Sequence, residues 1–219
     1  MNCSIFDIIG PRMIGPSSSH TAGAVRIGQI ANKLVGSHVK KAYVTLYGSF
    51  AETGRGHGTD MAIVAGILGM DPDEGGIRYS HFTAQQMGID IKIEFSKEEA
   101  AHPNTAKVHV VGTNGQEYTY IGTSVGGGRI EITSINDLEL GFSCEYPTLI
   151  VFHEDKLGTI TKVTSILAAE KINIAFMKVF RSQKSQAACM VIETDSQINE
   201  SVLKKIECAA ENITEVCFI

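Results

Sequence analysis

The chain has no tryptophan and few of the features that mark specialised classes of protein. Of its 219 residues, 43% are hydrophobic, 20% charged and 7% aromatic, which is typical of an ordinary globular protein. Its net charge is −5 and it has no cluster of lysine or arginine, so we expect neither nucleic acid nor a membrane surface as a partner. It also lacks a long apolar run and an N-terminal signal segment, which predicts a cytoplasmic protein.

Cysteine is sparse and scattered. None of the cysteines forms a CxxC pair, and their odd number in a reducing compartment argues against a disulfide framework. The spacing gives no sign of a self-contained zinc or iron–sulfur site, so we predict no metal ligands in this chain. The five positions are Cys3, Cys144, Cys189, Cys208 and Cys217.

The richest polar run in the chain lies where a helix is expected to begin. Apolar residues at helical spacing predict a helix over about residues 20–34, and Pro16 keeps the chain out of helical geometry just before it. Gly23 and Gly28 stand inside this helix, which predicts close packing against another backbone. The run itself is Ser17, Ser18, Ser19, His20 and Thr21.

One serine of this run suffices to cap the helix. The remaining groups exceed what a cap needs, and a helix N-terminus favours an anion. We therefore predict a polar binding site at residues 17–21. The alternative is that the run only caps the helix, with more hydroxyl groups than a cap needs, and that His20 is exposed to solvent.

A second glycine-rich polar stretch, residues 54–60, precedes the apolar positions of another helix. We predict that it is a loop, with Thr59 or Asp60 as the helix N-cap. His57 stands between two glycines, which leaves its imidazole accessible as a base, and Asp60 could orient it. The alternative is a flexible turn with an exposed histidine. Together with residues 17–21, the stretch predicts two helix starts that converge on one anionic ligand, with Gly58 and Thr59 also binding it.

The pattern of strands and helices predicts an α+β protein of two domains. A mixed α/β domain occupies residues 1–140, with an expected helix over 77–87 ended by Gly88. A polar, irregular segment over 136–147 contains the boundary. Residues 147–219 form the second domain, whose order of elements, β-α-β-β-α-β with a hairpin turn at 182–185, is that of the ferredoxin-like unit.

The loop after the first strand of the second domain is a candidate ligand site. Gly158 would let a ligand approach the backbone, and Asp155 could take an amino group. The alternative is a short loop whose residues only serve the geometry of the connection and bind no ligand. The full candidate set also includes Leu157, Asn173 and Ile174.

Several motifs resemble the β chain of the iron–sulfur-dependent L-serine dehydratases. Residues 148–219 resemble an ACT domain, a common amino-acid-sensing module, and the N-terminal domain is similar to the allosteric substrate-binding domain of some phosphoglycerate dehydrogenases. The motifs occupy residues 4–10, 15–23, 56–60, 102–107 and 126–132.

The resemblance implies that L-serine loses water to give aminoacrylate, which hydrolyses to pyruvate and ammonia. It implies a 4Fe-4S cluster that acts as a Lewis acid and is held by cysteines of an α chain. This chain would then be half an enzyme, inactive alone. Residues 17–21 would hold L-serine, His57 would be the acid/base with Asp60 orienting it, and His20 would share the site.

Two points stay open at this level. His57 or His20 could be the base, or either could only bind substrate. The whole chain could instead be a non-catalytic regulatory module that binds serine or another small anionic metabolite. The resemblance also implies edge-to-edge pairing of ACT domains, hence a homodimer through this domain.

Overall fold

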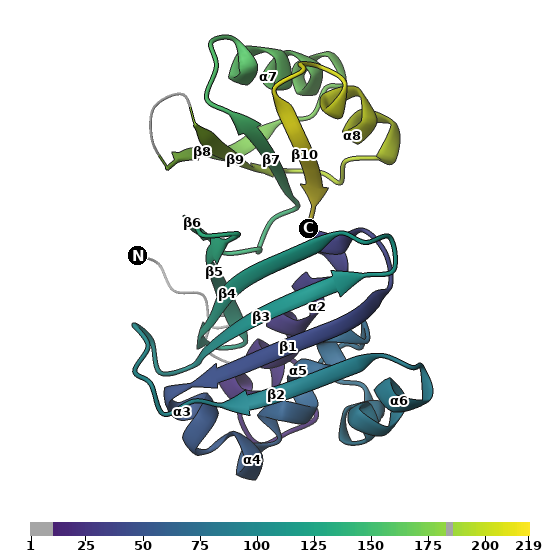
Figure 1. The fold of residues 1–219 in the computed structure, drawn as a ribbon, viewed down its shortest axis with the longest axis vertical. Coiled ribbons are helices and arrows are strands. Elements are labelled where there is room, and N and C mark those ends of the chain that lie inside the picture. Colours follow the sequence, from purple (N-terminus) through teal and green to yellow (C-terminus); the bar gives the residue numbers. More distant parts are fainter. Residues whose placement is uncertain (1–10, 183–185) are drawn as a thin grey trace. The chain divides into compact units, whose positions relative to one another are not determined.

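The computed structural model describes residues 11–182 and 186–219. The chain divides into two compact units, residues 1–137 and 138–219, which are described one at a time below (Figure 1). The predicted hairpin turn at 182–185 falls mostly outside the described residues, and so do Cys3 and the motif at 4–10. Among the helices of the described part, none is long and apolar enough to cross a membrane.

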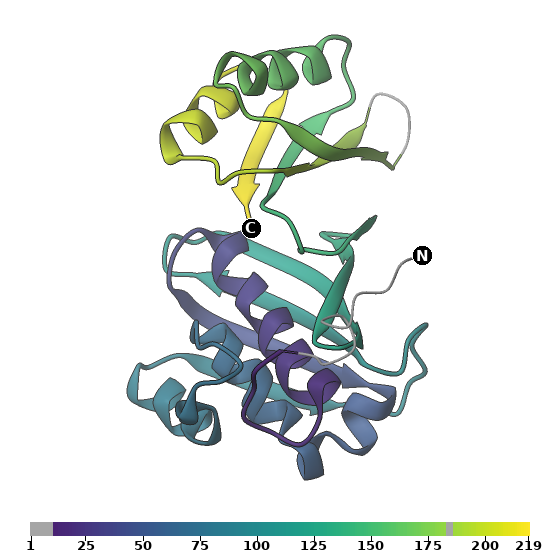
Figure 2. The ribbon, with the colours of Figure 1, turned by 180° about the vertical axis from the view of Figure 1, so that it is seen from behind.

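The first unit is a mixed sheet with helices on one face. Its strands lie in the order β2-β1-β3-β4-β5, with β1 and β2 parallel and the other pairs antiparallel. Helices α2 and α5 lie behind the sheet in Figure 1 and in front of it in Figure 2. The bounds are α2 (Ala24–Val35), β1 (Val39–Tyr47), α5 (Thr59–Ile67), β2 (Asp90–Phe95), β3 (Thr105–Gly112), β4 (Glu117–Gly126) and β5 (Arg129–Ile135).

Alternation along β1 explains why one face is covered. Ala42, Val44 and Leu46 are buried on the helix side, whereas Lys41 and Tyr43 are exposed on the other. This period of two is what a half-buried strand requires. The sheet therefore carries the core on one face only.

Helices α2 and α5 cross at two glycines. A methyl group added at Gly28 would lie 2.2 Å from the carbonyl oxygen of Ile63, and one added at Gly66 would lie 2.0 Å from that of Val25. Both distances are far below van der Waals contact, so only glycine fits. The predicted close packing of Gly28 against another backbone is confirmed; at Gly23 the neighbour is instead the side chain of Ser124.

The structure corrects the expected starts of these helices. The helix predicted over 20–34 begins as a π-helix, η1 (Ser18–Gly23), with Ser17 as its N-cap. The stretch predicted as a loop over 54–60 is helical: α3 (Gly48–Glu52) leads through Thr53 into α4 (Gly54–His57). The N-cap of α5 is Gly58, at φ 71°, rather than Thr59 or Asp60.

The remaining helical prediction in this unit is close to the structure. Residues 77–87 fall on a 3-10 turn, η2 (Gly75–Tyr79), followed by α6 (Ser80–Gln86). Gly88 follows at φ 69°, as expected for the residue after a helix. The segment predicted as irregular over 136–147 contains a short strand, β6 (Leu138–Phe142), which the sequence did not predict.

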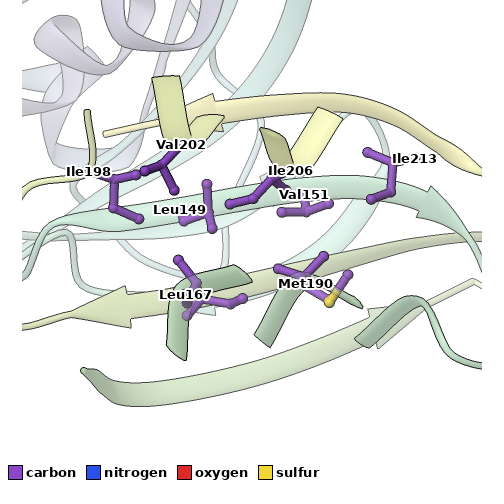
Figure 3. Packing of buried hydrophobic residues seen from close by; sticks show 10 residues of the cluster. Leu149, Val151, Leu167, Met190, Ile198, Val202, Ile206 and Ile213 are labelled. Carbon is purple, nitrogen blue, oxygen red and sulfur yellow. The ribbon is translucent and has the colours of Figure 1, made fainter. Parts of the chain in front are cut away.

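The second unit has the predicted β-α-β-β-α-β order, with sheet order β10-β7-β9-β8. The α+β fold class, with its ferredoxin-like C-terminal part, is confirmed. Helices and sheet enclose an aliphatic core that includes Leu149, Leu167 and Met190 (Figure 3). The elements are β7 (Thr148–Glu154), α7 (Thr159–Ala169), β8 (Ile174–Arg181), β9 (Ala187–Thr194), α8 (Glu200–Glu207) and β10 (Ile213–Phe218).

Candidate functional site

The structure brings the two motif histidines of the first unit together. The ring centroids of His20, in η1, and His57, in α4, are 4.8 Å apart, with 44° between the ring planes. Two segments far apart in sequence thus meet at their imidazoles. The π-helical turn that carries His20 is a feature often found at functional sites.

His20 is buried and surrounded by hydroxyl groups. Its Nδ1 lies 3.3 Å from Ser17 Oγ, and its Nε2 lies 3.1 Å from Thr53 Oγ1 and 3.2 Å from Ser49 Oγ. Phe50 packs against the ring edge-on, at 5.2 Å between centroids. Burial lowers the pKa of His20; the Ser49 carbonyl opposes this effect and the neighbouring His57 adds to it. At neutral pH, His20 is therefore an uncharged ring that can donate at one nitrogen and accept at the other.

His57 is half-buried and held by a backbone group. Its Nδ1 lies 3.1 Å from the carbonyl oxygen of Thr53. A carbonyl only accepts, so Nδ1 carries the hydrogen and Nε2 of the neutral ring keeps its lone pair. In this neutral form, His57 Nε2 is the nitrogen that can accept a hydrogen bond or a proton.

Asp60 has a different partner from the one predicted. Its Oδ2 lies 3.6 Å from Nε2 of His81, whereas His57 is oriented by Thr53. Burial raises the pKa of Asp60, but hydrogen bonds and the charge of His81 outweigh burial and hold it below its usual value. The expectation that Asp60 orients His57 is therefore not what the structure shows. His81 lies in α6 and carries no motif that would have singled it out.

The other predicted substrate-binding residues divide into two groups. Ser17, Ser18 and Ser19 are partly exposed, and Ser17 Oγ accepts from the backbone N–H of His20. Thr21 and Thr59 are almost completely buried, and neither hydroxyl oxygen has a hydrogen-bond partner among the described residues. The serines therefore remain accessible to a ligand, while both threonines face the interior. Gly58 is partly exposed, next to His57.

Sequence reasoning missed Ser49 and Thr53. Both come from α3 and the residue that follows it, and they reach His20 only because the fold places α3 against η1. The turn at residues 102–105 lies beside them, since the N–H of Phe50 donates to the carbonyl of Pro103 at 3.3 Å. No local pattern in the sequence marked these hydroxyls.

No group of three or more His, Cys, Asp or Glu side chains in the described part of the chain could hold a metal ion. Of the four described cysteines, Cys189 and Cys217 are buried. Burial raises the pKa of Cys189 to about 12, which opposes the thiolate form that iron–sulfur clusters need. These residues do not fit an iron–sulfur cluster.

In the second unit, the candidate effector loop is partly occupied by its own contacts. Asp155 Oδ2 lies 3.3 Å from Nη1 of Arg181, while Leu157 is fully exposed. Gly158 has φ 84° and caps α7 without a side-chain hydrogen bond.

His153, directly before this loop, was missed by the sequence reasoning. It is 4% exposed, its Nδ1 lies 2.8 Å from the carbonyl oxygen of Glu154, and its buried Nε2 has no hydrogen-bond partner among the described residues. A buried polar atom without a partner is costly, which makes His153 a further candidate for ligand contact.

The two halves of the predicted effector site lie at opposite ends of the sheet. Strand registers place Glu154 beside Ala187 and Arg181 beside Ala188, whereas Ile174 pairs with Thr194 at the other end. Seven strand steps at roughly 3.3 Å each separate the ends of β8 by about 23 Å. Asn173 there donates to Asp195 Oδ2 at 2.6 Å. One copy of this unit therefore does not bring Asp155 and Asn173 together.

Comparison with family models matches both units. Residues 4–89 match the model described as "Serine dehydratase beta chain". Residues 149–211 match the "AHAS small subunit-like ACT domain". The first match contains both histidines of the candidate site, and the second contains the Asp155–Gly158 loop.

Curated relatives match over nearly the whole chain. A probable L-serine dehydratase beta chain of Bacillus subtilis is 46% identical over 203 residues, 93% of this chain and 92% of the relative. The L-serine dehydratase beta chain of Peptoniphilus asaccharolyticus is 36% identical over 99% of this chain and 97% of the relative. A D-3-phosphoglycerate dehydrogenase of Synechocystis is 24% identical over 84% of this chain but only 33% of its own length. With its two-unit architecture and paired histidines, this chain belongs to the family of L-serine dehydratase beta chains.

Proposed function

We propose that this β chain converts L-serine to pyruvate and ammonia together with an iron–sulfur α subunit, and that it supplies the acid/base groups of the shared site. The observation that carries the proposal is the approach of the His20 and His57 rings to 4.8 Å. A base poised to take the α-proton of an amino acid needs a free lone pair near neutral pH. In its neutral form the His57 ring has this lone pair on Nε2, since Nδ1 donates to the Thr53 carbonyl.

The serines of η1 are proposed to bind the substrate carboxylate. Ser18 and Ser19 are accessible at the first turn of a helical segment, where backbone N–H groups favour negative charge. Ser17, the N-cap of η1, contacts both the ring and the backbone N–H of His20 in the same turn. In this arrangement His57 removes the α-proton, while the buried, uncharged His20 packs beside the His57 ring and holds Ser17 through the contact at its Nδ1.

The iron–sulfur cluster of the proposal belongs to the α chain. The described cysteines of this chain are dispersed and two of them are buried, so they do not form a ligand set. This chain is accordingly proposed to be inactive alone. The 4Fe-4S cluster, the products and a cytoplasmic location are parts of the same proposal.

The test is reconstitution with the α chain under anaerobic conditions, followed by a pyruvate assay with L-serine. Replacing His57 by alanine should lower kcat by roughly 10²–10⁴, the usual contribution of a general acid or base. His38→Ala is the matched control, because His38 is an exposed histidine of the same unit. Near-normal turnover of His57→Ala would remove His57 from the mechanism and favour the regulatory-module alternative.

The second unit is proposed to be the regulatory part, working as a homodimer. Strand β8 is the edge of its sheet and exposes Phe176 and Val179, a surface suited to pairing with a second copy. Antiparallel pairing of two β8 strands would bring the Asp155 end of one copy to the Asn173 end of the other. The ligand proposed for this joint site is L-serine or another small anionic metabolite, with Leu157, Gly158 and Ile174 contributing contacts.

A further inference from the structure

We propose that Thr53 is the positioning residue that sets the tautomers of both imidazoles, its backbone acting on His57 and its hydroxyl on His20. The inference rests on the proposed role of the two histidines in L-serine dehydration. It adds a residue that no motif of the sequence contains.

The backbone of Thr53 sets His57. Thr53 stands between α3 and α4, at φ −111° and ψ −6°, and its carbonyl oxygen is 3.1 Å from both the backbone nitrogen and the Nδ1 of His57. A single carbonyl therefore accepts from the backbone and the ring of the same residue. The ring is left with its free lone pair on Nε2.

The hydroxyl of Thr53 sets His20. Thr53 Oγ1 donates its hydrogen to the carbonyl oxygen of Ser49 at 2.9 Å. Because the hydroxyl has only this one hydrogen, the Thr53 oxygen must accept a hydrogen bond at its 3.1 Å contact with His20 Nε2. His20 therefore carries its hydrogen on Nε2.

The hydrogen bond at Nδ1 of His20 follows from this tautomer. In the neutral ring Nδ1 is then the acceptor, and Ser17 Oγ, 3.3 Å away, is the donor. The same Ser17 oxygen accepts from the His20 backbone N–H. The carbonyl oxygen of Ser49 also lies 3.4 Å from His20 Nε2 and can only accept, so the shorter contact with the Thr53 hydroxyl and this carbonyl together favour the Nε2–H form.

A purely structural role for this hydroxyl is a weaker explanation. Thr53 is exposed, so its side chain is not needed to fill the core. Its bond to the carbonyl four residues back is of a kind that recurs at Thr83, whose Oγ1 donates to Tyr79 O at 3.1 Å. Thr53 differs from Thr83 in that its Oγ1 also contacts the imidazole of His20.

The first test is ¹⁵N NMR of the histidine rings in the full-length chain, comparing wild type with Thr53→Val. Valine keeps the shape and the backbone carbonyl but removes the hydroxyl. We expect the His20 ring to change from the Nε2–H form to a mixture of tautomers, because only the longer, 3.4 Å contact with the Ser49 carbonyl then favours the Nε2–H form. The His57 ring should keep its Nδ1–H form, because its partner is a backbone atom. Thr53→Ala serves as a second variant should the valine chain fold poorly.

The second test is turnover of the enzyme reconstituted with the α chain. Thr53→Val should lower kcat about 10-fold with little change in KM, which corresponds to one lost hydrogen bond. Thr53→Ser should restore most of the turnover and the His20 tautomer. Thr83→Val, which loses the same type of bond without a histidine, should behave like wild type.

An unchanged His20 tautomer in both Thr53→Val and Thr53→Ala would overturn the inference, and so would a changed tautomer with unaltered kcat in an enzyme that His57→Ala inactivates. The NMR result does not depend on catalysis. If His57→Ala retains turnover while Thr53→Val shifts the His20 tautomer, the proposed function fails and the positioning of the ring stands.

Discussion

The two units differ in how completely one copy of the chain assembles its candidate site. In the first unit, η1, α3 and α4 bring Ser17, His20, Thr53 and His57 within contact of one another. In the second unit, Asp155 and Asn173 lie at opposite ends of the sheet. The residues that this chain is proposed to supply to the first site meet within one copy, whereas those proposed for the second site could meet only across two copies.

The difference follows from the local structure around each site. Residues 17–21 and 48–57 form short helical turns whose side chains point at each other across a few ångströms. The candidate effector residues sit on loops at the two ends of strands of a βαββαβ unit, and the length of those strands keeps the loops apart. The proposed acid/base geometry is thus formed within one copy of the chain, and the proposed regulation would require two copies.

We expect the largest effect on stability from a substitution that disrupts the helix packing of the first unit alone. A methyl group at Gly28 would collide with the Ile63 carbonyl and the Ile67 nitrogen at 2.2 and 2.9 Å. Because both neighbours are backbone atoms of α5, relief requires the helices to separate. Gly28→Ala should therefore destabilise the first unit by about 3 kcal/mol, at the upper end of typical overpacking costs.

Hydrogen exchange can measure the loss of stability in each unit separately. Amides of α2 and α5 should lose protection while those of β7 and β9 keep theirs. Gly75→Ala is the control, because Gly75 is exposed and a methyl group there meets no atom within 4 Å. Equal loss of protection in both units would contradict the view that each carries its own core.

The same contrast explains what the sequence could predict. Regular periodicity in residues 148–219 predicted each strand and helix of the second unit. In the first unit the motif residues His20 and His57 were identified and do meet. The glycines of residues 54–57 predict a loop, because glycine disfavours helix. The structure makes them helical, with Gly54 packed against Thr59 and Phe95.

The missed residues share a physical cause. Ser49 and Thr53 act through contacts with His20, which is distant in sequence, and His81 acts through Asp60. Single hydroxyls and an isolated histidine give no periodic or motif signal. Only the packing of α3 against η1, and of α6 against α5, brings them to the site.

A smaller effect, about 10-fold in affinity, is expected when one half of the proposed effector site is removed. With L-serine as the probe, Asp155→Ala and Asn173→Ala should each weaken binding to the second unit by one polar contact. If the joint site spans two copies, a mixed dimer of the two variants carries one doubly altered site and one intact site. Calorimetry should then find wild-type affinity at half the stoichiometry.

Two outcomes would count against this arrangement. A mixture that binds no better than the separate variants would place both residues in one copy's site, against the registers of β7, β8 and β9. A monomeric chain in sedimentation experiments would remove the β8 interface itself. His38→Ala again controls for a substitution on the surface of the first unit.

The smallest expected effect is the pH dependence that burial of His20 imposes on the first unit. Burial, with a further contribution from His57, holds the folded-state pKa of His20 below its unfolded value of 6.5. The unfolded chain therefore binds the proton more readily, so stability is full above pH 6.5 and falls as the pH drops through the folded-state pKa. His20→Gln should flatten this fall between pH 7.5 and 5, because glutamine takes up no proton.

Urea unfolding followed by tyrosine fluorescence is a suitable measurement, since Tyr118 and Tyr120 are buried in the first unit. Asp60 and its partner His81 are present in both proteins, so their contributions cancel in the difference between wild type and His20→Gln. Parallel stability curves would mean that the His20 ring is protonated as easily inside the fold as outside it. In that case burial would not favour the uncharged form of His20, and the contrast between a preformed first site and a shared second site would lose this chemical support.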